Sequence, residues 1–274
     1  MMNKFGLIFR HYLRRTFMEK ISLFANLLLP IVLIFLFVLV QEYQVEDVET
    51  LLLNGTNNFL HTIVVVQMLF FFQVFGAFYN VDNLHELATS ETKWRLNAAP
   101  INRLVFQIAA IAGGWLVSLL QTLLIIGVMS IFLNIYWGSM GINILALLAI
   151  SLFSQILGVF LFVITKNKTQ GYVVTYPIVF GLGALSGFLI PIRELVNLRI
   201  VDFLADWSPL TLAMDSVAYG GTVGPDRYID LVDGVVTYGG GDMSIAIRNI
   251  LIISAIAIAL AVASYAIGKV RKIW

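Results

Sequence analysis

The chain has 274 residues, of which 59% are hydrophobic and 12% are charged, and its net charge is +1. Soluble domains carry about 25% charged residues, so this composition excludes an ordinary water-soluble domain. The chain contains no cysteine, which excludes disulfides, thiolate catalysis and cysteine-ligated metal sites. The nearly neutral charge balance gives no indication of nucleic-acid binding.

Residues 1–20 are predicted to form an amphipathic helix that lies in the cytoplasmic interface of a membrane. Apolar residues recur there at helical spacing, with basic residues on the opposite side. The apolar stripe consists of Phe5, Ile8, Phe9, Tyr12 and Thr16, and Arg10, His11 and Arg14 project opposite to it. The alternative is a simple basic flank that orients the first span. The helix interpretation also predicts contact with a cytoplasmic partner.

Six apolar stretches follow, each long enough to cross the roughly 30 Å hydrocarbon core of a bilayer as a helix. They comprise residues 21–40, 59–79, 104–133, 142–165, 171–192 and 246–268. Asp, Glu, Lys and Arg are absent from them except for Arg248, near the start of the sixth stretch. The sequence therefore predicts an all-α polytopic membrane protein in which residues 21–274 form a six-span transmembrane domain.

The basic residues are distributed asymmetrically between the gaps. Thirteen of the 17 lysines and arginines fall in the N-terminal segment, the second and fourth gaps and the C-terminal tail. The other gaps hold three basic residues and twelve acidic ones, and the remaining basic residue is Arg248 near the start of the sixth stretch. Because basic loops are retained in the cytoplasm, this distribution predicts that both termini are cytoplasmic and that the protein lies in the cell membrane (plasma or inner).

The second span carries the candidate translocation path. Gln67, Phe71, Gln73 and Phe75 combine amides with aromatic rings, which together suit a soft, apolar route for an amphipathic molecule. Two alternatives stay open, because such amides often bond between helices and such rings often face lipid. No acidic or basic residue lies at mid-membrane depth, which disfavours an ion-coupled or proton-coupled carrier.

Residues 81–103 form the longest predicted cytoplasmic segment between spans, and at about twenty residues it is too short for a nucleotide-binding domain. The sequence has no Walker A pattern, since its only Gly-Lys pair, Gly268-Lys269, is followed by Val270. No set of Ser, His and Asp, no carboxylate pair and no metal-binding spacing can be placed at membrane depth. We therefore expect no enzymatic activity, no metal and no cofactor bound by this chain.

The gap between the fifth and sixth spans, residues 191–245, alternates polar and apolar residues before a glycine-rich loop at residues 220–241. This pattern predicts short extracellular helices that dip into the outer leaflet as re-entrant elements, followed by a loop. Neither part is long enough to cross the membrane alone.

The chain resembles the membrane subunits of ABC exporters of the drug and polysaccharide type, also called type-two permeases. The N-terminal interfacial helix is similar to the connecting helix of that family. The segment Glu91 to Pro100 resembles the family's coupling helix: Thr92, Arg95, Leu96 and Pro100 match, whereas Glu91 replaces the usual glycine. The third similarity lies in the outer region, at Gly187, Pro191, Ser208 and Pro209.

The resemblance implies a six-span half-transporter that pairs with a second permease, identical or homologous, and with a dimer of ABC ATPase subunits. ATP and Mg would be held by that ATPase. The coupling residues would be Glu91, Thr92, Trp94, Arg95, Leu96 and Pro100, with Trp94 and Leu96 supplying the apolar contacts. The cargo would be amphipathic, such as a drug, an antimicrobial peptide or a lipid-like molecule, and export would confer multidrug or antibiotic resistance. A secondary carrier and a non-transporting immunity or accessory protein stay open as alternatives.

Overall fold

The structure is a computed structural model that describes residues 4–18, 24, 28–45, 57–89, 103–133, 135, 137, 139–189, 195–196, 198–219, 230–232, 235–237 and 242–271. Within these residues the fold consists of helices and one small hairpin. The helices are α1 (Lys4–Met18), α3 (Leu29–Val45), α4 (Asn57–Thr89), α6 (Arg103–Leu133), α7 (Met140–Ile164), α8 (Lys168–Leu185), α10 (Arg199–Asp206), α11 (Pro209–Tyr219) and α12 (Met243–Arg271).

In the part of the chain that the structure describes, four helices are long and apolar enough to cross a membrane by length and composition. They contain the stretches Val64–Thr89, Leu104–Leu133, Met140–Ile164 and Met243–Lys269, which match predicted spans two, three, four and six. The apolar part of α3, Leu29–Val40, is shorter, and α8 begins with the polar residues Lys168, Thr169 and Gln170. The first and fifth spans, and with them the total of six, therefore remain predictions.

Two of the predicted boundaries differ from the helices. α4 continues ten residues beyond residue 79, so the first part of the segment predicted as cytoplasmic is a continuation of the span helix. α8 ends at Leu185 rather than at residue 192, because Gly187 adopts a φ of 76° that residues with a Cβ rarely take.

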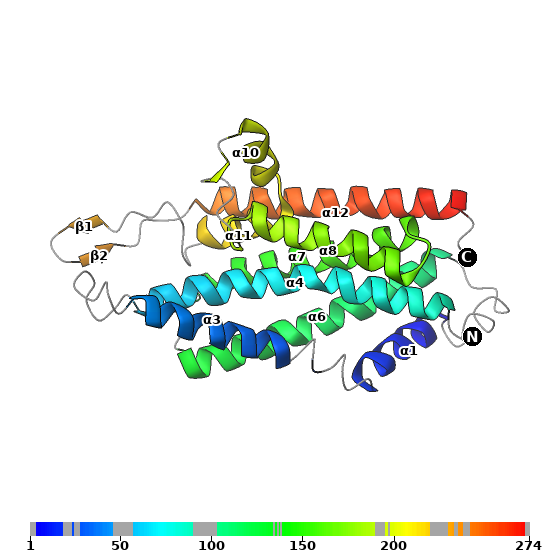
Figure 1. Ribbon diagram of the computed structural model, residues 1–274, viewed down its shortest axis with the longest axis horizontal. Helices are drawn as coiled ribbons and strands as arrows, with labels where there is room; N and C mark the ends of the chain where they lie inside the picture. The colour runs from blue at the N-terminus through cyan, green and yellow to red at the C-terminus, as the bar shows by residue number, and fades with distance from the viewer. Residues whose placement is uncertain are drawn as a thin grey trace.

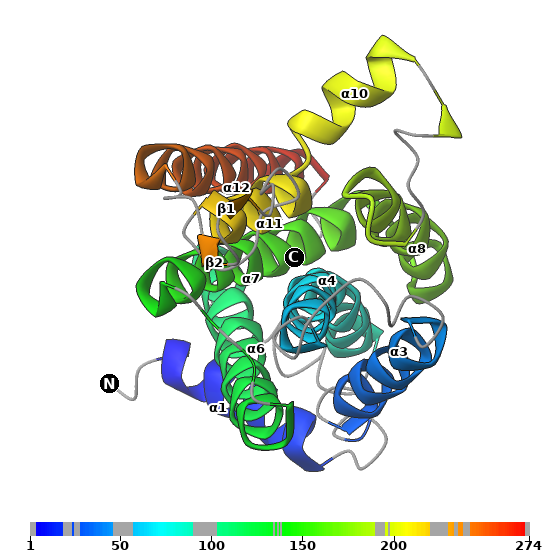
Figure 2. The same cartoon turned by 90° about the vertical axis from the view of Figure 1, so that its left-hand side faces the viewer.

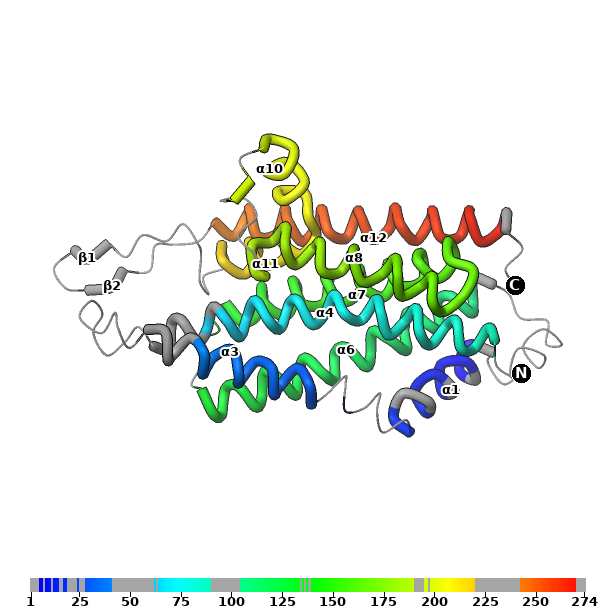
Figure 3. The backbone as a smooth tube through the Cα atoms, viewed as in Figure 1, coloured from blue at the N-terminus to red at the C-terminus, as the bar shows by residue number. Residues whose placement is uncertain are grey.

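The long helices lie side by side, and the chain alternates its direction from one to the next (Figures 1 and 3). The end-on view places α7 in the middle, with α4, α6, α11 and α12 around it (Figure 2). α1, the last turn of α12 and the turn at residues 165–167 lie at one end, which we call the basic end. Its described basic residues are Arg10, Arg14, Lys166, Lys168 and Lys269.

At the basic end, α1 packs against the bundle with the apolar face that the sequence predicts. Ile8 and Tyr12 are buried against residues of α4, α6 and α7, whereas Arg10 and Arg14 are exposed. The amphipathic stripe is thus confirmed for these side chains. α1 packs mainly against α6, and Tyr12 also reaches Asn80 on α4.

The opposite end of the bundle holds α10, α11 and a hairpin of β1 (Asp230–Val232) and β2 (Val235–Thr237) (Figure 1). The strands are antiparallel, with Asp230 opposite Thr237. This hairpin lies within the loop predicted at residues 220–241, and the rest of the described fold is helical, as the sequence predicts. Its sequence signal is the Asp233-Gly234 dipeptide between Val232 and Val235, because an Asp-Gly pair flanked by strand-forming residues favours a two-residue hairpin.

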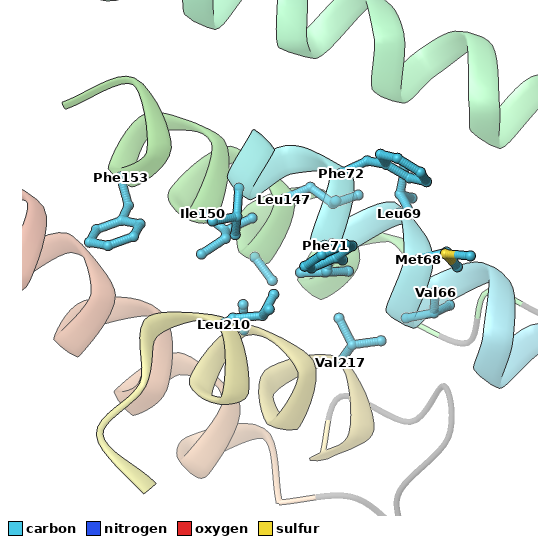
Figure 4. Packing of buried hydrophobic residues seen from close by; sticks show 14 of the residues in the cluster. Val66, Met68, Leu69, Phe71, Phe72, Leu147, Ile150, Phe153, Leu210 and Val217 are labelled. Carbon is cyan, nitrogen blue, oxygen red and sulfur yellow. The ribbon is translucent and has the colours of Figure 1, made fainter. Parts of the chain in front are cut away.

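α11 belongs to the core of the bundle. Leu210 and Val217 are buried in one cluster with Phe71 of α4 and with Leu147 and Ile150 of α7 (Figure 4). The helices approach closely where small residues meet: a Cβ on Gly158 of α7 would lie 2.7 Å from the carbonyl oxygen of Ala77 on α4. Such contacts are the usual basis of helix association in a bilayer, where apolar burial drives little.

Candidate translocation surface

One face of α4 carries three of the four predicted path residues. Gln67, Phe71 and Phe75 are four residues apart, so they lie one above another on the helix. Phe71 is 5% exposed, and Gln67 and Phe75 are half-buried. This face is turned toward α8, whose Phe180 ring contacts both Phe71 and Phe75.

The rings of α4 and of α8 with the residues that follow it form a continuous aromatic seam, made of Phe71, Phe75, Phe78, Tyr172, Tyr176, Phe180 and Phe188. The ring centroids of Phe71 and Phe75 are 5.0 Å apart, and each also contacts Phe180 at 6.1 and 5.7 Å. Phe78 stacks on Tyr172 at 4.8 Å. These separations are those of favourable aromatic pairs.

The seam is buried on one edge and open on the other. Phe71 packs against the backbone of α8 at Gly183, where a Cβ would lie 2.6 Å from the Phe71 ring. Tyr176 and Phe180, by contrast, are 44% and 45% exposed in the single chain. The exposed edge of the seam is therefore an aromatic surface on α8 that a neighbouring molecule can contact.

Gln73 is not part of this face. It lies two residues from both Phe71 and Phe75, which is about 200° around the helix. Its side chain is 1% exposed, and neither Nε2 nor Oε1 has a hydrogen-bond partner among the described residues. The structure thus separates Gln73 from the other three predicted path residues and places it in the packed interior.

A charged cluster lies where the seam meets the basic end. Lys168 Nζ is 2.6 Å from Asp82 Oδ1 and 3.6 Å from Glu86 Oε2, and the Tyr172 hydroxyl donates to Asp82. Burial tends to lower the pKa of Lys168, but its hydrogen bonds to Asp82 and Tyr172 prevail and raise that pKa. The sequence signal was the placement of Asp82 and Glu86 one turn apart, which puts both carboxylates on one face of α4.

A chain of buried hydrogen bonds connects α1 to the interior. The Tyr12 hydroxyl donates to Asn80 Oδ1 at 3.3 Å, and Asn80 Nδ2 donates to the Gln155 carbonyl oxygen at 2.9 Å. Gln155 Nε2 in turn donates to Ser118 Oγ at 3.0 Å. These residues come from α1, α4, α7 and α6, and the sequence pattern gave no signal that they meet. Tyr12, Ser118 and Gln155 also border a small cavity of about 20 Å³ that Gly76 and Gly114 help to line.

The remaining predicted site residues fall in two groups. Glu91, Thr92, Trp94, Arg95, Leu96 and Pro100 of the predicted coupling segment, and Pro191, lie outside the described residues. Gly187 ends α8, and Ser208 and Pro209 are buried at the start of α11. Among the residues that the structure describes, no group of three His, Asp or Glu side chains could hold a metal ion.

Comparison with known protein families gives one informative match. The family model for the ABC-2 type transporter matches residues 4–220, which is most of the chain. No curated protein gives a match. The matched range contains α1, the aromatic seam, the charged cluster and α11. The chain therefore belongs to the ABC-2 type transporter family, and it is a multi-pass membrane protein that serves as the permease component of an ABC-type transporter.

Proposed function

We propose that the chain is the permease subunit of an ATP-driven exporter that moves an amphipathic cargo out of the cytoplasm or the inner leaflet. The cargo would be a drug, an antimicrobial peptide or a lipid-like molecule. The chain would cross the membrane six times with both ends in the cytoplasm, and α10 and α11 would sit as re-entrant helices in the outer leaflet. It would pair with a second permease and with an ATPase dimer that holds ATP and Mg.

The family assignment favours this function over the secondary carrier and the accessory protein. These 274 residues contain no Walker A pattern, which agrees with ATP hydrolysis by a partner ATPase subunit. The basic end of the bundle, where α1 lies, where α4 ends and where α6 begins, is the side at which that subunit would dock.

The aromatic seam is the observation that supports an amphipathic cargo. A bare charge at mid-membrane costs roughly 2.5 to 3.5 kcal/mol even on lenient scales, and the seam between Phe71 and Phe180 offers no opposite charge. An apolar body could instead lie on the exposed rings of Tyr176 and Phe180. A polar end could be held by Gln67 or, at the basic end, by Asp82 and Glu86.

The test is export by proteoliposomes that contain the chain and its ATPase. Phe71→Ala and Gln67→Ala should change the preference among amphipathic cargoes more than they change basal ATP hydrolysis. Phe132→Ala is the matched control, because Phe132 is an exposed ring on α6 that is not part of the seam. An equal loss for every cargo would mean that Phe71 and Gln67 only hold the helices together.

A further inference from the structure

A groove lies between the first turns of α6 and the last turns of α12. Its volume is about 300 Å³, and Ile156 and Val159 of α7 form its floor. Leu104 and Ile108 line the α6 side, and Val262 lines the α12 side. All three are exposed in the single chain, so the groove is an open, apolar channel rather than an enclosed cavity.

One largely buried polar side chain of the groove has no hydrogen-bond partner among the described residues. Gln107 lines it and is 8% exposed, and the structure gives its amide no hydrogen bond to any described residue. A buried amide is destabilising unless it is hydrogen-bonded. Gln107 is four residues from the start of α6, or about 6 Å along the helix axis. The Gln107 amide could therefore bind a hydrogen-bonding group that enters the groove about one helical turn from the start of α6.

An exposed basic residue lies near the end of the groove. α12 carries Lys269 in its last turn, and the Lys269 side chain is exposed. None of α6, α7 and α12 contains an acidic residue, so no carboxylate of the three lining helices offsets this charge. Basic pockets between membrane helices on the cytoplasmic side bind anionic lipid headgroups.

We propose that this groove binds an anionic phospholipid of the leaflet at the basic end. One acyl chain lies between α6 and α12 on Ile156 and Val159. An ester carbonyl oxygen accepts a hydrogen bond from the Gln107 amide, and the phosphate lies at the helix end marked by Lys269. The site is separate from the aromatic seam, and the proposal does not depend on which cargo the protein moves.

The absence of cysteine allows a direct test with single cysteine substitutions. A bimane label on Val262→Cys reports the groove, and one on Ala259→Cys is the matched control, because Ala259 is exposed on α12 but does not line the groove. The full chain is placed in nanodiscs that contain either brominated phosphatidylglycerol or brominated phosphatidylcholine. Brominated phosphatidylglycerol should quench the label at residue 262 at about fivefold lower mole fraction than phosphatidylcholine. At residue 259 the two lipids should quench equally.

Further variants separate the headgroup from the ester contact. Lys269→Gln should remove most of the preference for phosphatidylglycerol, whereas Lys166→Gln, an exposed lysine at the same end, should leave it unchanged. Ether-linked phosphatidylglycerol lacks the ester carbonyl, so it should bind the wild type more weakly and Gln107→Leu no more weakly than the ester lipid. Equal quenching by both headgroups at residue 262 would overturn the proposal. Quenching by neither lipid there, with normal quenching at residue 259, would also overturn it and would indicate that a second copy of the chain covers the groove.

Discussion

The Tyr12 hydroxyl on α1 donates a hydrogen bond to Asn80 Oδ1 on α4, across 3.3 Å and between residues 68 positions apart in the sequence. Asn80 Nδ2 in turn donates a hydrogen bond to the Gln155 carbonyl oxygen on α7. A helix at the basic end is thereby fastened to the interior of the bundle by a directional contact as well as by apolar packing. A displacement of α1 would therefore strain or break the hydrogen bond to Asn80 and could shift Asn80 relative to Gln155.

Tyr12→Phe tests this connection. The substitution keeps the ring, which packs against Gly113, and removes only the hydroxyl. Loss of a typical buried hydrogen bond costs about 1 kcal/mol, so the apparent Tm in detergent should fall by a few degrees. Stimulation of the ATPase by cargo should fall as well, if α1 transmits motion. Tyr219→Phe is the control, because Tyr219 is the last residue of α11 and lies outside both this chain of hydrogen bonds and the groove between α6 and α12. Equal behaviour of the two variants would mean that the Tyr12 hydroxyl contributes neither to stability nor to coupling.

Gln73→Leu is expected to stabilise the protein. Its buried amide has no partner among the described residues, and an unsatisfied buried group costs about 1 to 3 kcal/mol. Leucine has a similar size and no polar atoms, so thermal unfolding should shift to higher temperature. Gln67→Leu, at a half-buried position, should change the unfolding temperature less. A destabilised Gln73→Leu variant would show that the amide has a partner in the assembled transporter.

The predicted topology can be read from single cysteines in this cysteine-free chain. Impermeant thiol reagents added to intact cells should label Thr50→Cys, Gly138→Cys and Gly239→Cys. Asn97→Cys and Asn167→Cys should react only after the cells are opened, because the basic gaps are expected in the cytoplasm. Labelling of residue 97 in intact cells would contradict the six-span arrangement with both ends inside.

Much of the helical frame could be predicted from the sequence, because apolar runs end where charged residues or turns begin. The third stretch was expected at residues 104–133 and α6 spans Arg103–Leu133, and the fourth was expected at 142–165 and α7 spans Met140–Ile164. The end of α4 was harder to predict. Charged residues such as Asp82 and Glu86 mark the end of an apolar run, but they do not end the helix, which continues through them.

Contacts between distant residues could not be predicted in the same way. Whether Asp82 meets Lys168, or Tyr12 meets Asn80, depends on how each helix is rotated against its neighbours. A single sequence contains no direct record of that rotation. The separation of Gln73 from Phe71 could have been predicted, however, because residues two apart lie on nearly opposite sides of a helix. The valine-flanked Asp233-Gly234 dipeptide was likewise a readable signal of the hairpin.

The most direct test of the proposed function is cargo-stimulated ATP hydrolysis by the chain reconstituted with its partner ATPase in proteoliposomes. Trp94→Ala combined with Leu96→Ala removes the expected apolar contacts to the ATPase, and truncating such anchors commonly costs on the order of 2 kcal/mol or more. We predict that an amphipathic cargo stimulates hydrolysis by the wild type, and that the double variant loses this stimulation while its expression and unfolding temperature are unchanged. If cargo stimulated hydrolysis equally in the double variant and in the wild type, the coupling contact would have to lie elsewhere in the chain. A rate of hydrolysis that is the same with and without the chain would contradict its role as the permease of an ATP-driven exporter.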